Sequence, residues 1–403
     1  MTSQEPDCVK RFREFVRIKT VHPVPDYESS TKFLLKQAEE IGLTSQVVEA
    51  VKGKPVVILG LPGTDPSLPA LMLGSHTDVV PVFEEFWTYP PFSAERVPTE
   101  DGDFKIYGRG SQDMKITSCM HLEALRRIKE SGIKLKRNVF AVLYPDEEIG
   151  GQEGVKAYVE TKEFADLNIG FDIDEGMLAA NDRINVSYSE RINGQVRLTA
   201  YGNTGHGSQF IEGTAIEKIL PVINALLEKR QEQKALLAAK GDPSTNEHSG
   251  EFIAINLTMA SGGKQANLVP ASFTATFDVR ITPKEDPEIF KSWLKDLATS
   301  NGVEVEFLFP NEKRYITGLD KSNTFVNAFY SSLAKHNIDP LPIICPAVSD
   351  CRHFRAKGIP TLGFVPVKNH TMLAHAHDEF VLESEFLSGI DIFYDLIQDM
   401  ANA

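Results

Sequence analysis

An apolar stretch is followed directly by a histidine and an aspartate in Ala70-Leu71-Met72-Leu73-Gly74-Ser75-His76-Thr77-Asp78. A short apolar run that ends in polar residues is typical of a buried strand. His76 then stands at the carboxyl end of that strand, where open α/β sheets bind ligands. A single histidine is more often an ordinary core or surface residue, so its role depends on the residues that accompany it.

Helical patterns and apolar runs alternate on both sides of this strand. Alternation of this kind predicts a layered α/β domain. The predicted helices lie at 30–41, 114–131, 323–336 and 383–400, and the further predicted strands lie at 56–61, 139–144 and 361–365.

The pattern changes between residues 188 and 309, where strands alternate apolar with polar residues, as at Phe273, Ala275 and Phe277. Helical segments at 212–237 and 286–300 accompany these strands, and a polar loop is expected at 240–250. This combination predicts a small α+β sandwich. We therefore expect a discontinuous domain of residues 1–187 and 310–403, interrupted by an inserted domain of residues 188–309.

Composition favours an acidic enzyme without a nucleic-acid or membrane partner. The formal net charge is -14 and the pI is near 5.3, whereas nucleic acids and anionic membranes need a basic surface. No apolar run approaches the roughly 20 residues of a membrane helix, and the polar first residues show no signal-peptide pattern. The four cysteines are scattered without a C-x-x-C pair. We expect a cytoplasmic location.

Carboxylates and histidines follow several predicted strands, and each has an ordinary alternative role. An aspartate at a helix start can act as an N-cap, and acidic or histidine-rich loops can simply be solvated. Taken together, they form a set of oxygen and nitrogen ligands that suits two divalent ions of the zinc type. The residues are Asp113, the clusters Asp146-Glu147-Glu148 and Asp172-Ile173-Asp174-Glu175, and the pair His375 and His377.

The order and spacing of these motifs resemble the M20 metallopeptidase family, and within it the aminoacylase-1 branch. The resemblance spans nearly the whole chain and is therefore more specific than one short motif. It implies a zinc-peptidase-like catalytic domain with a mixed sheet flanked by helices, plus an inserted α+β sandwich that acts as a lid and in dimerisation. The segments that carry it are 75–81, 110–115, 145–151, 174–176, 205–206 and 375–379.

The resemblance also implies a ligand set for two Zn²⁺ ions per subunit. His76 and Glu175 would bind one ion, Glu148 and His375 the other, and Asp113 would bridge them. Three carboxylates against two dications leave a net positive charge, which favours activation of water. The family's pattern selects His375 as the ligand over His377.

Two further residues complete the implied catalytic centre. Asp78 would brace His76 from outside the ligand set. Glu147 would act as the general base, taking a proton from the water and passing it to the departing amine. Neighbouring residues in an extended backbone point apart, so we expect Glu147 and Glu148 to divide the roles of base and ligand.

The resemblance assigns substrate contacts in both domains. His206 lies in a glycine-rich turn and would donate a hydrogen bond to the oxyanion across a homodimer interface. Arg280 alternates with core-facing residues, so it points away from the core and is either a carboxylate ligand or an ordinary exposed arginine. With Asn267 and Arg352, it would hold the substrate carboxylate. Ser349 stands where the family usually has threonine.

We therefore expect hydrolysis of a small-molecule substrate, an N-acyl-L-amino acid, to a carboxylate and a free L-amino acid. The nearest alternatives are an M20-type dipeptidase or a dedicated deacetylase such as acetylornithine deacetylase. An alternative from another class is a non-catalytic, metal-containing binding protein. Structural zinc sites are usually closed and cysteine-rich, which disfavours that alternative. The absence of G-x-S-x-G disfavours a serine hydrolase.

Overall fold

The computed structural model describes residues 4–242, 247–309 and 313–403, which divide into two compact units. Unit 1 comprises Met1–Tyr188, Thr317–Pro342 and Ser349–Ala403, and unit 2 comprises Ser189–Ile316 and Ile343–Val348. The expected domain boundary at 309/310 adjoins residues outside the described part, and the expected loop at 240–250 falls partly on such residues.

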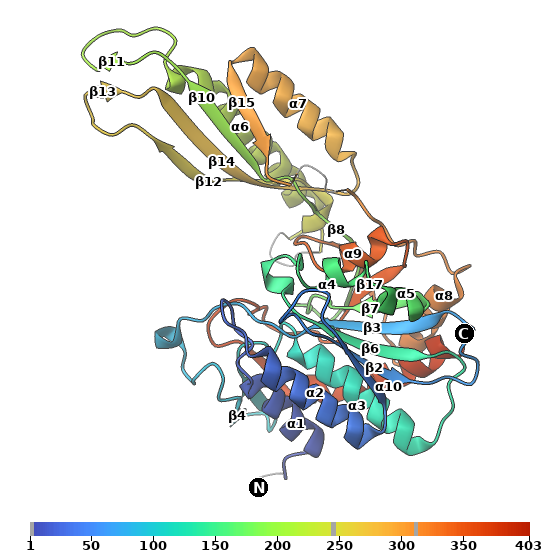
Figure 1. The fold of residues 1–403 in the computed structure, drawn as a ribbon. Coiled ribbons are helices and arrows are strands. Elements are labelled where there is room, and N and C mark those ends of the chain that lie inside the picture. The colour runs from blue at the N-terminus through green and yellow to red at the C-terminus, as the bar shows by residue number, and fades with distance from the viewer. Residues whose placement is uncertain (1–3, 243–246, 310–312) are drawn as a thin grey trace. The chain divides into compact units, whose positions relative to one another are not determined.

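Unit 1 is built around a mixed sheet in the order β1-β2-β6-β3-β7-β17-β8-β16 (Figure 1). The strands β6, β3, β7 and β17 run parallel, whereas β1, β2 and β8 pair antiparallel with their neighbours. The bounds are β1 Thr44–Val48, β2 Val56–Leu61, β3 Ala70–His76, β6 Val139–Tyr144, β7 Ile169–Asp174, β8 Asn185–Glu190, β16 Leu341–Cys345 and β17 Thr361–Phe364.

Helices cover both faces of this sheet. Successive residues of its central strands point to opposite sides, and apolar side chains on both sides are buried against helices. Leu71 and Leu73 of β3 pack into the larger core, whereas Met72 belongs to a second core on the other face. The larger core includes side chains of α1 Asp7–Arg17, α2 Tyr27–Ile41, α3 Lys115–Ser131, α8 Thr324–Lys335 and α10 Glu383–Ala401. The second core includes side chains of α4 Val155–Tyr158, α5 Lys162–Asp166 and α9 Cys351–Ala356.

The parallel strands bring their carboxyl ends to one edge of the sheet. His76 at the end of β3 pairs with Tyr144 at the end of β6, and β7 on the other side of β3 ends at Asp174. The segments after these strands therefore begin side by side. A smaller sheet in the order β18-β5-β4 lies in the same unit, with bounds β4 Glu95–Pro98, β5 Phe104–Tyr107 and β18 Phe380–Leu382.

Unit 2 is a sheet in the order β12-β14-β10-β15, with β9 paired to β14 and two helices packed against the sheet (Figure 1). Ala275, Phe277 and Val279 of β14 are buried, which agrees with the alternation in the sequence. The bounds are β9 Ile192–Asn193, β10 Val196–Tyr201, β12 Ala254–Gly262, β14 Ser272–Ile281, β15 Val303–Phe307, α6 Ala215–Lys240 and α7 Pro287–Ser300. A short ladder pairs β11 Gly205–His206 with β13 Leu268–Val269.

The expected α/β architecture with a mixed, helix-flanked sheet is confirmed for unit 1. The helix expected at 114–131 is α3, and the apolar runs at 56–61 and 139–144 are β2 and β6. Within the described residues, no helix combines the length and apolar composition required to cross a bilayer.

Candidate metal centre

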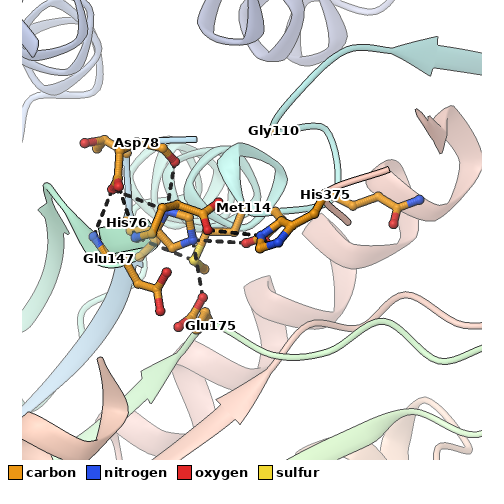
Figure 2. A network of polar contacts seen from close by, with 12 residues as sticks. His76, Asp78, Gly110, Met114, Glu147, Glu175 and His375 are labelled. Atoms are coloured by element: carbon orange, nitrogen blue, oxygen red, sulfur yellow. Dashed lines mark hydrogen bonds and ion pairs between the residues drawn. The ribbon is translucent and has the colours of Figure 1, made fainter. Parts of the chain in front are cut away.

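The five residues expected to bind metal lie together at the carboxyl edge of the unit 1 sheet, and Figure 2 labels three of them, His76, Glu175 and His375. His76 Nε2 is 3.0 Å from Asp113 Oδ1 and 3.3 Å from Glu175 Oε2. His375 Nε2 is 3.1 Å from Asp113 Oδ2 and 3.0 Å from Glu148 Oε2. Asp113 thus presents one carboxylate oxygen to each histidine, as a bridging ligand would.

The donor atoms fit a cation site. Ligand atoms of His76, Asp113 and Glu148 lie within 4.8 Å of one another, and so do those of His76, Glu147 and Glu175. The buried Glu148 Oε1 and Glu175 Oε1 have no hydrogen-bond partner within the described part of the chain. Buried polar atoms normally have a partner, so these oxygens indicate a ligand such as a divalent ion.

The electrostatics of the carboxylates agree with this interpretation. Burial raises the pKa of Glu175 to about 7, and burial together with the charge of Asp113 raises the pKa of Glu148. Burial and the charge of Glu175 raise the pKa of Glu147 well above its usual value. Each shift expresses the cost of gathering negative charges away from water. A nearby cation offsets that cost and keeps the carboxylates ionised.

Asp113 does not cap the helix that follows it, so that alternative is wrong. The N-cap of α3 is Met114, and no side chain makes a capping hydrogen bond there. Both carboxylate oxygens of Asp113 face histidines instead. The side chain therefore belongs to the ligand cluster.

Asp78 supports His76 through its backbone. His76 Nδ1 lies 3.0 Å from the Asp78 carbonyl oxygen, whereas the distance to Asp78 Oδ1 is 3.6 Å. The carbonyl thus orients the imidazole so that Nε2 faces Asp113 and Glu175.

The carboxylate of Asp78 holds a different part of the centre. It accepts hydrogen bonds from the backbone N–H groups of Glu147 and Glu148 at 3.2 and 3.1 Å. Its Oδ2 also lies 2.9 Å from His22 Nε2, and this contact raises the pKa of His22. Asp78 therefore fixes the turn that carries Glu147 and Glu148.

Asp146 belongs to a second support of that turn and not to the metal cluster. Its carboxylate accepts a hydrogen bond from Tyr27 at 2.6 Å and pairs with Lys54 at 2.5 Å. The repulsion expected among three adjacent carboxylates is therefore relieved for Asp146 by a lysine. His22, Tyr27 and Lys54 were missed from the sequence because each stands alone, far from any motif.

The side chains of Glu147 and Glu148 point to different neighbours, as expected. The expected cause, an extended backbone, is wrong. They lie in the 3₁₀ helix η2, Glu147–Ile149, which follows Asp146 in a left-handed conformation with φ of 68°. Glu148 faces His375, whereas the carboxylate of Glu147 lies on the side of His76 and Glu175 (Figure 2).

The structure also distinguishes the two histidines near the carboxyl terminus. His375 meets Asp113 and Glu148, whereas the ring of His377 lies 5.2 Å from that of Phe86 and 6.4 Å from that of Phe83. His375 is therefore the histidine that joins the ligand cluster.

Ser349 and Arg352 lie beside the turn that carries Glu147. Arg352 donates hydrogen bonds to the carbonyl oxygens of Ser349 at 2.7 Å and Gly150 at 3.0 Å. Between them, Asp350 is fully buried, and burial raises its pKa well above the usual value. The sequence analysis passed over Asp350, although it stands between Ser349 and Arg352 in the chain.

The substrate residues expected in unit 2 fall into two groups. His206 in β11 pairs with Leu268, and Gly207 N–H donates to the Asn267 carbonyl at 2.8 Å, so His206 and Asn267 lie on adjoining segments. His206 is exposed, and its Nδ1 lies 2.8 Å from Ser208 Oγ.

Arg280 lies toward the opposite end of β14, where it pairs with Asn193. Its guanidinium donates to the Asp278 carboxylate at 2.9 and 3.2 Å, so both side chains project from the same face of the strand. From Ser272 to Arg280 the strand spans about 26 Å at roughly 3.3 Å per residue. Within one chain, Arg280 is thus separated from His206 and Asn267.

Comparison with known proteins agrees with the motifs. A model of peptidase family M20/M25/M40 matches residues 72–399. Aminoacylase-1 of Sus scrofa is 41% identical over 99% of this chain and 96% of that protein. An M20 family metallo-carboxypeptidase from Sulfolobus solfataricus has a TM-score of 0.75 at 20% identity, covering 98% of this chain and 100% of the other.

A dinuclear metal-binding peptidase of the M20 family from Bacillus subtilis has a TM-score of 0.68 at 16% identity, covering 98% of both chains. These structures share the fold, and the similarity to the aminoacylase-1 of Sus scrofa extends over nearly the whole of both chains. The resemblance inferred from the sequence is confirmed, and the chain belongs to peptidase family M20/M25/M40.

Proposed function

We propose that this protein hydrolyses N-acyl-L-amino acids to a carboxylate and a free L-amino acid. The observation that carries the proposal is the cluster of His76, Asp113, Glu148, Glu175 and His375 with Glu147 beside it. Aminoacylase-1 of Sus scrofa, similar over the full length, supports this substrate class in preference to a peptide.

The cofactor proposed is a pair of Zn²⁺ ions. His76 and Glu175 would hold one, Glu148 and His375 the other, with Asp113 between them. Bound dications supply Lewis acid chemistry, which lowers the pKa of a water molecule and polarises an amide carbonyl. Mixed nitrogen and oxygen donors suit zinc.

Glu147 supplies the proton transfer. One of its carboxylate oxygens lies within 4.8 Å of ligand atoms of His76 and Glu175, which supports a role in accepting a proton from the attacking water. It then donates that proton to the nitrogen of the departing amine. Asp78 keeps the Glu147 turn in place through the two backbone N–H groups.

The substrate carboxylate would be bound by arginine. Arg352 lies next to Gly150, three residues from Glu147, and Ser349 lies at the same turn. Arg280 and Asn267 of unit 2 are the further candidates. A guanidinium matches the two oxygens of a carboxylate, which explains why a free α-carboxylate would be required.

The separation of the unit 2 residues supports a homodimer. Arg280 and His206 cannot serve one active site from the same chain when the strand between them spans about 26 Å. We propose that His206 and Asn267 act in the site of a second copy, where His206 donates a hydrogen bond to the oxyanion. A two-fold dimer gives each site one such contribution.

A cytoplasmic location accompanies this proposal. The four cysteines are few and scattered through the 403 residues without a C-x-x-C pair, a usage that is typical of a reducing compartment. Cell fractionation of the tagged full chain tests the location.

The decisive experiment for the substrate is a panel assayed with the zinc-loaded protein. We expect N-acetylmethionine to be cleaved with a higher kcat/KM than simple dipeptides and N-acetylornithine. A clear preference for a dipeptide would indicate a dipeptidase, and a preference for N-acetylornithine a dedicated deacetylase. Zinc binding without turnover on any of them would favour a binding protein.

A further inference from the structure

We propose that Glu379 and Gln112 form a latch between the two loops that carry Asp113 and His375, and that they act as positioning residues for the metal ligands. The proposal rests on the metal centre described above. Asp113 and His375 are far apart in sequence and meet only because these two loops are joined.

The latch begins in the backbone. Strand β5 leads into residues 108–113, and β18 directly follows residues 375–379. The two strands pair antiparallel with Phe380 opposite Tyr107, and Gly108 N–H donates to the Glu379 carbonyl at 2.9 Å. Because of this pairing, the two ligand loops lie side by side where they approach the metal centre.

The side chain of Glu379 accepts hydrogen bonds from several residues of the loop that carries Asp113. Its Oε1 accepts backbone hydrogen bonds from Gly110 at 3.1 Å, Gln112 at 2.7 Å and Asp113 at 3.3 Å. Its Oε2 accepts a bond from Arg109 Nη1 at 2.5 Å. Glu379 is fully buried, so all four donors are needed to compensate a carboxylate removed from water.

Gln112 reaches back to the loop of His375. Its Nε2 donates to the carbonyl oxygens of Thr371 at 3.0 Å and Phe380 at 2.8 Å, and its Oε1 accepts from Leu373 N–H at 2.9 Å. The Leu373 carbonyl accepts from Ala376 N–H at 2.8 Å, which closes a turn around His375. Gln112 thus holds the turn from both sides.

The backbone of His375 explains why such a hold is required. Its φ is 65°, in the left-handed region that few residues other than glycine adopt, although histidine does so more often than most. The residue is also exposed, so core packing does not hold it. A conformation of this kind persists when its surroundings over-determine it, and the latch supplies those surroundings.

The test is zinc binding by Glu379→Gln in the full chain, with two comparison variants. Gln112→Met keeps the length of the side chain and removes the hydrogen bonds of its amide, including the contact of Nε2 with His370 Nδ1 at 3.3 Å. This variant decides the matter if Glu379→Gln does not fold. Glu383→Gln is the matched control, because Glu383 is a buried partner of Arg96 at 2.6 and 2.9 Å and touches neither ligand loop.

Zinc affinity is measured by competition with a chromophoric chelator, and thermal unfolding is recorded with and without zinc. We expect Glu379→Gln and Gln112→Met to lose about 10- to 100-fold in affinity for at least one Zn²⁺. We expect Glu383→Gln to bind zinc like the unmodified chain even if its metal-free form unfolds at a lower temperature.

Wild-type zinc affinity in both latch variants would overturn the proposal, and so would an equal loss in Glu383→Gln, which would indicate general destabilisation. If the unmodified chain binds no divalent ion, the metal centre itself is wrong and the latch falls with it. Zinc binding by the unmodified chain without any hydrolysis would instead leave the latch testable while removing the proposed activity.

Discussion

At the scale of single residues, the geometry of the centre depends on hydrogen bonds among its own side chains and backbone groups. Asp78 is the clearest case, because its carbonyl orients His76 while its carboxylate holds the Glu147 turn and His22. Asp146 supports the same turn from the other direction through Tyr27 and Lys54. The predictions for single residues therefore distinguish a residue proposed to transfer a proton from a residue that holds the turn in place.

Glu147→Ala tests the chemistry. The substitution removes the proposed base and leaves the five ligands, so kcat should fall by roughly 10²- to 10⁴-fold with zinc content unchanged. Turnover of N-acetylmethionine and zinc per chain are the two measurements. Glu153→Ala, at an exposed position in the following turn, is the control and should retain activity. Full activity of Glu147→Ala would remove Glu147 as the base.

Tyr27→Phe tests the support. The hydroxyl of Tyr27 donates to the buried Asp146, and loss of a hydrogen bond to a charged group should lower the free energy of unfolding by about 2 kcal/mol. Urea denaturation measures the change. Tyr158→Phe is a matched control, because the Tyr158 hydroxyl is buried without a hydrogen-bond partner in the described structure. Equal losses would contradict the proposed support.

His121 should make stability depend on pH. It is buried against the edge of Phe393, with ring centroids 4.5 Å apart, and burial lowers the pKa of His121 to about 3. Below pH 6.5 the unfolded chain binds a proton there that the folded chain does not bind, so stability falls as pH falls. From pH 7 to pH 5 this residue should remove about 2 kcal/mol of unfolding free energy.

The measurement is urea denaturation of the unmodified chain and His121→Leu at several pH values. Leucine cannot bind a proton, so the difference between the two proteins should change by that amount between pH 7 and pH 5 and stay constant above pH 7. Parallel curves throughout would show that His121 does not contribute.

At the scale of elements, most of the residues proposed to bind metal lie in segments that connect strands and helices and not in the strands themselves. Only His76 lies within a strand, whereas Glu148 lies in η2, Glu175 directly after β7, and Asp113 just before α3. These connections are held by contacts with other loops. Small backbone changes in them should therefore affect the site.

Gly151→Ala tests one such connection. Gly151 has φ of 64°, and an added Cβ would lie 2.1 Å from Asp350 Oδ1. Gly150 has φ of 96° with nothing within 4 Å, so Gly150→Ala carries backbone strain without a clash. We expect about 1 kcal/mol of destabilisation for Gly150→Ala and about 1 to 3 kcal/mol more for Gly151→Ala.

Unfolding by urea and the KM for N-acetylmethionine are the measurements. The displaced Asp350 lies two residues from Arg352, so Gly151→Ala should also raise KM. Indistinguishable values for the two variants would mean that Asp350 moves away from the added Cβ without a loss of unfolding free energy. The short distance between Gly151 and Asp350 would then have no consequence for the site.

At the scale of the whole molecule, the separation of His206 from Arg280 within one chain leads to a test of shared sites. Glu147→Ala and His206→Ala chains should each be inactive alone. After subunit exchange, half of the dimers are mixed and each has one intact site, so about a quarter of the activity should return. No recovery after exchange verified by mass spectrometry would show that His206 acts within its own chain or has no role.

The motifs, with the family resemblance that they carry, were sufficient to predict the family and the mixed, helix-flanked sheet, and the five residues expected to bind metal lie close together in the fold. Such predictions succeed because they depend on local patterns: an apolar run forms a strand, and a polar group after it lies at the edge of the sheet. The helices at 114–131 and 383–400 were likewise recognisable from their apolar periodicity.

Tertiary structure decided the contacts between residues remote in sequence. His22, Tyr27 and Lys54 carry no motif, and their partners Asp78 and Asp146 are known only once the chain is folded. For Asp113, the fold excludes the alternative of a helix cap, and for His375 it shows the contacts with Asp113 and Glu148 that the family's pattern only implied. Sequence patterns record which chemistry is present, whereas long-range packing determines which of those groups meet.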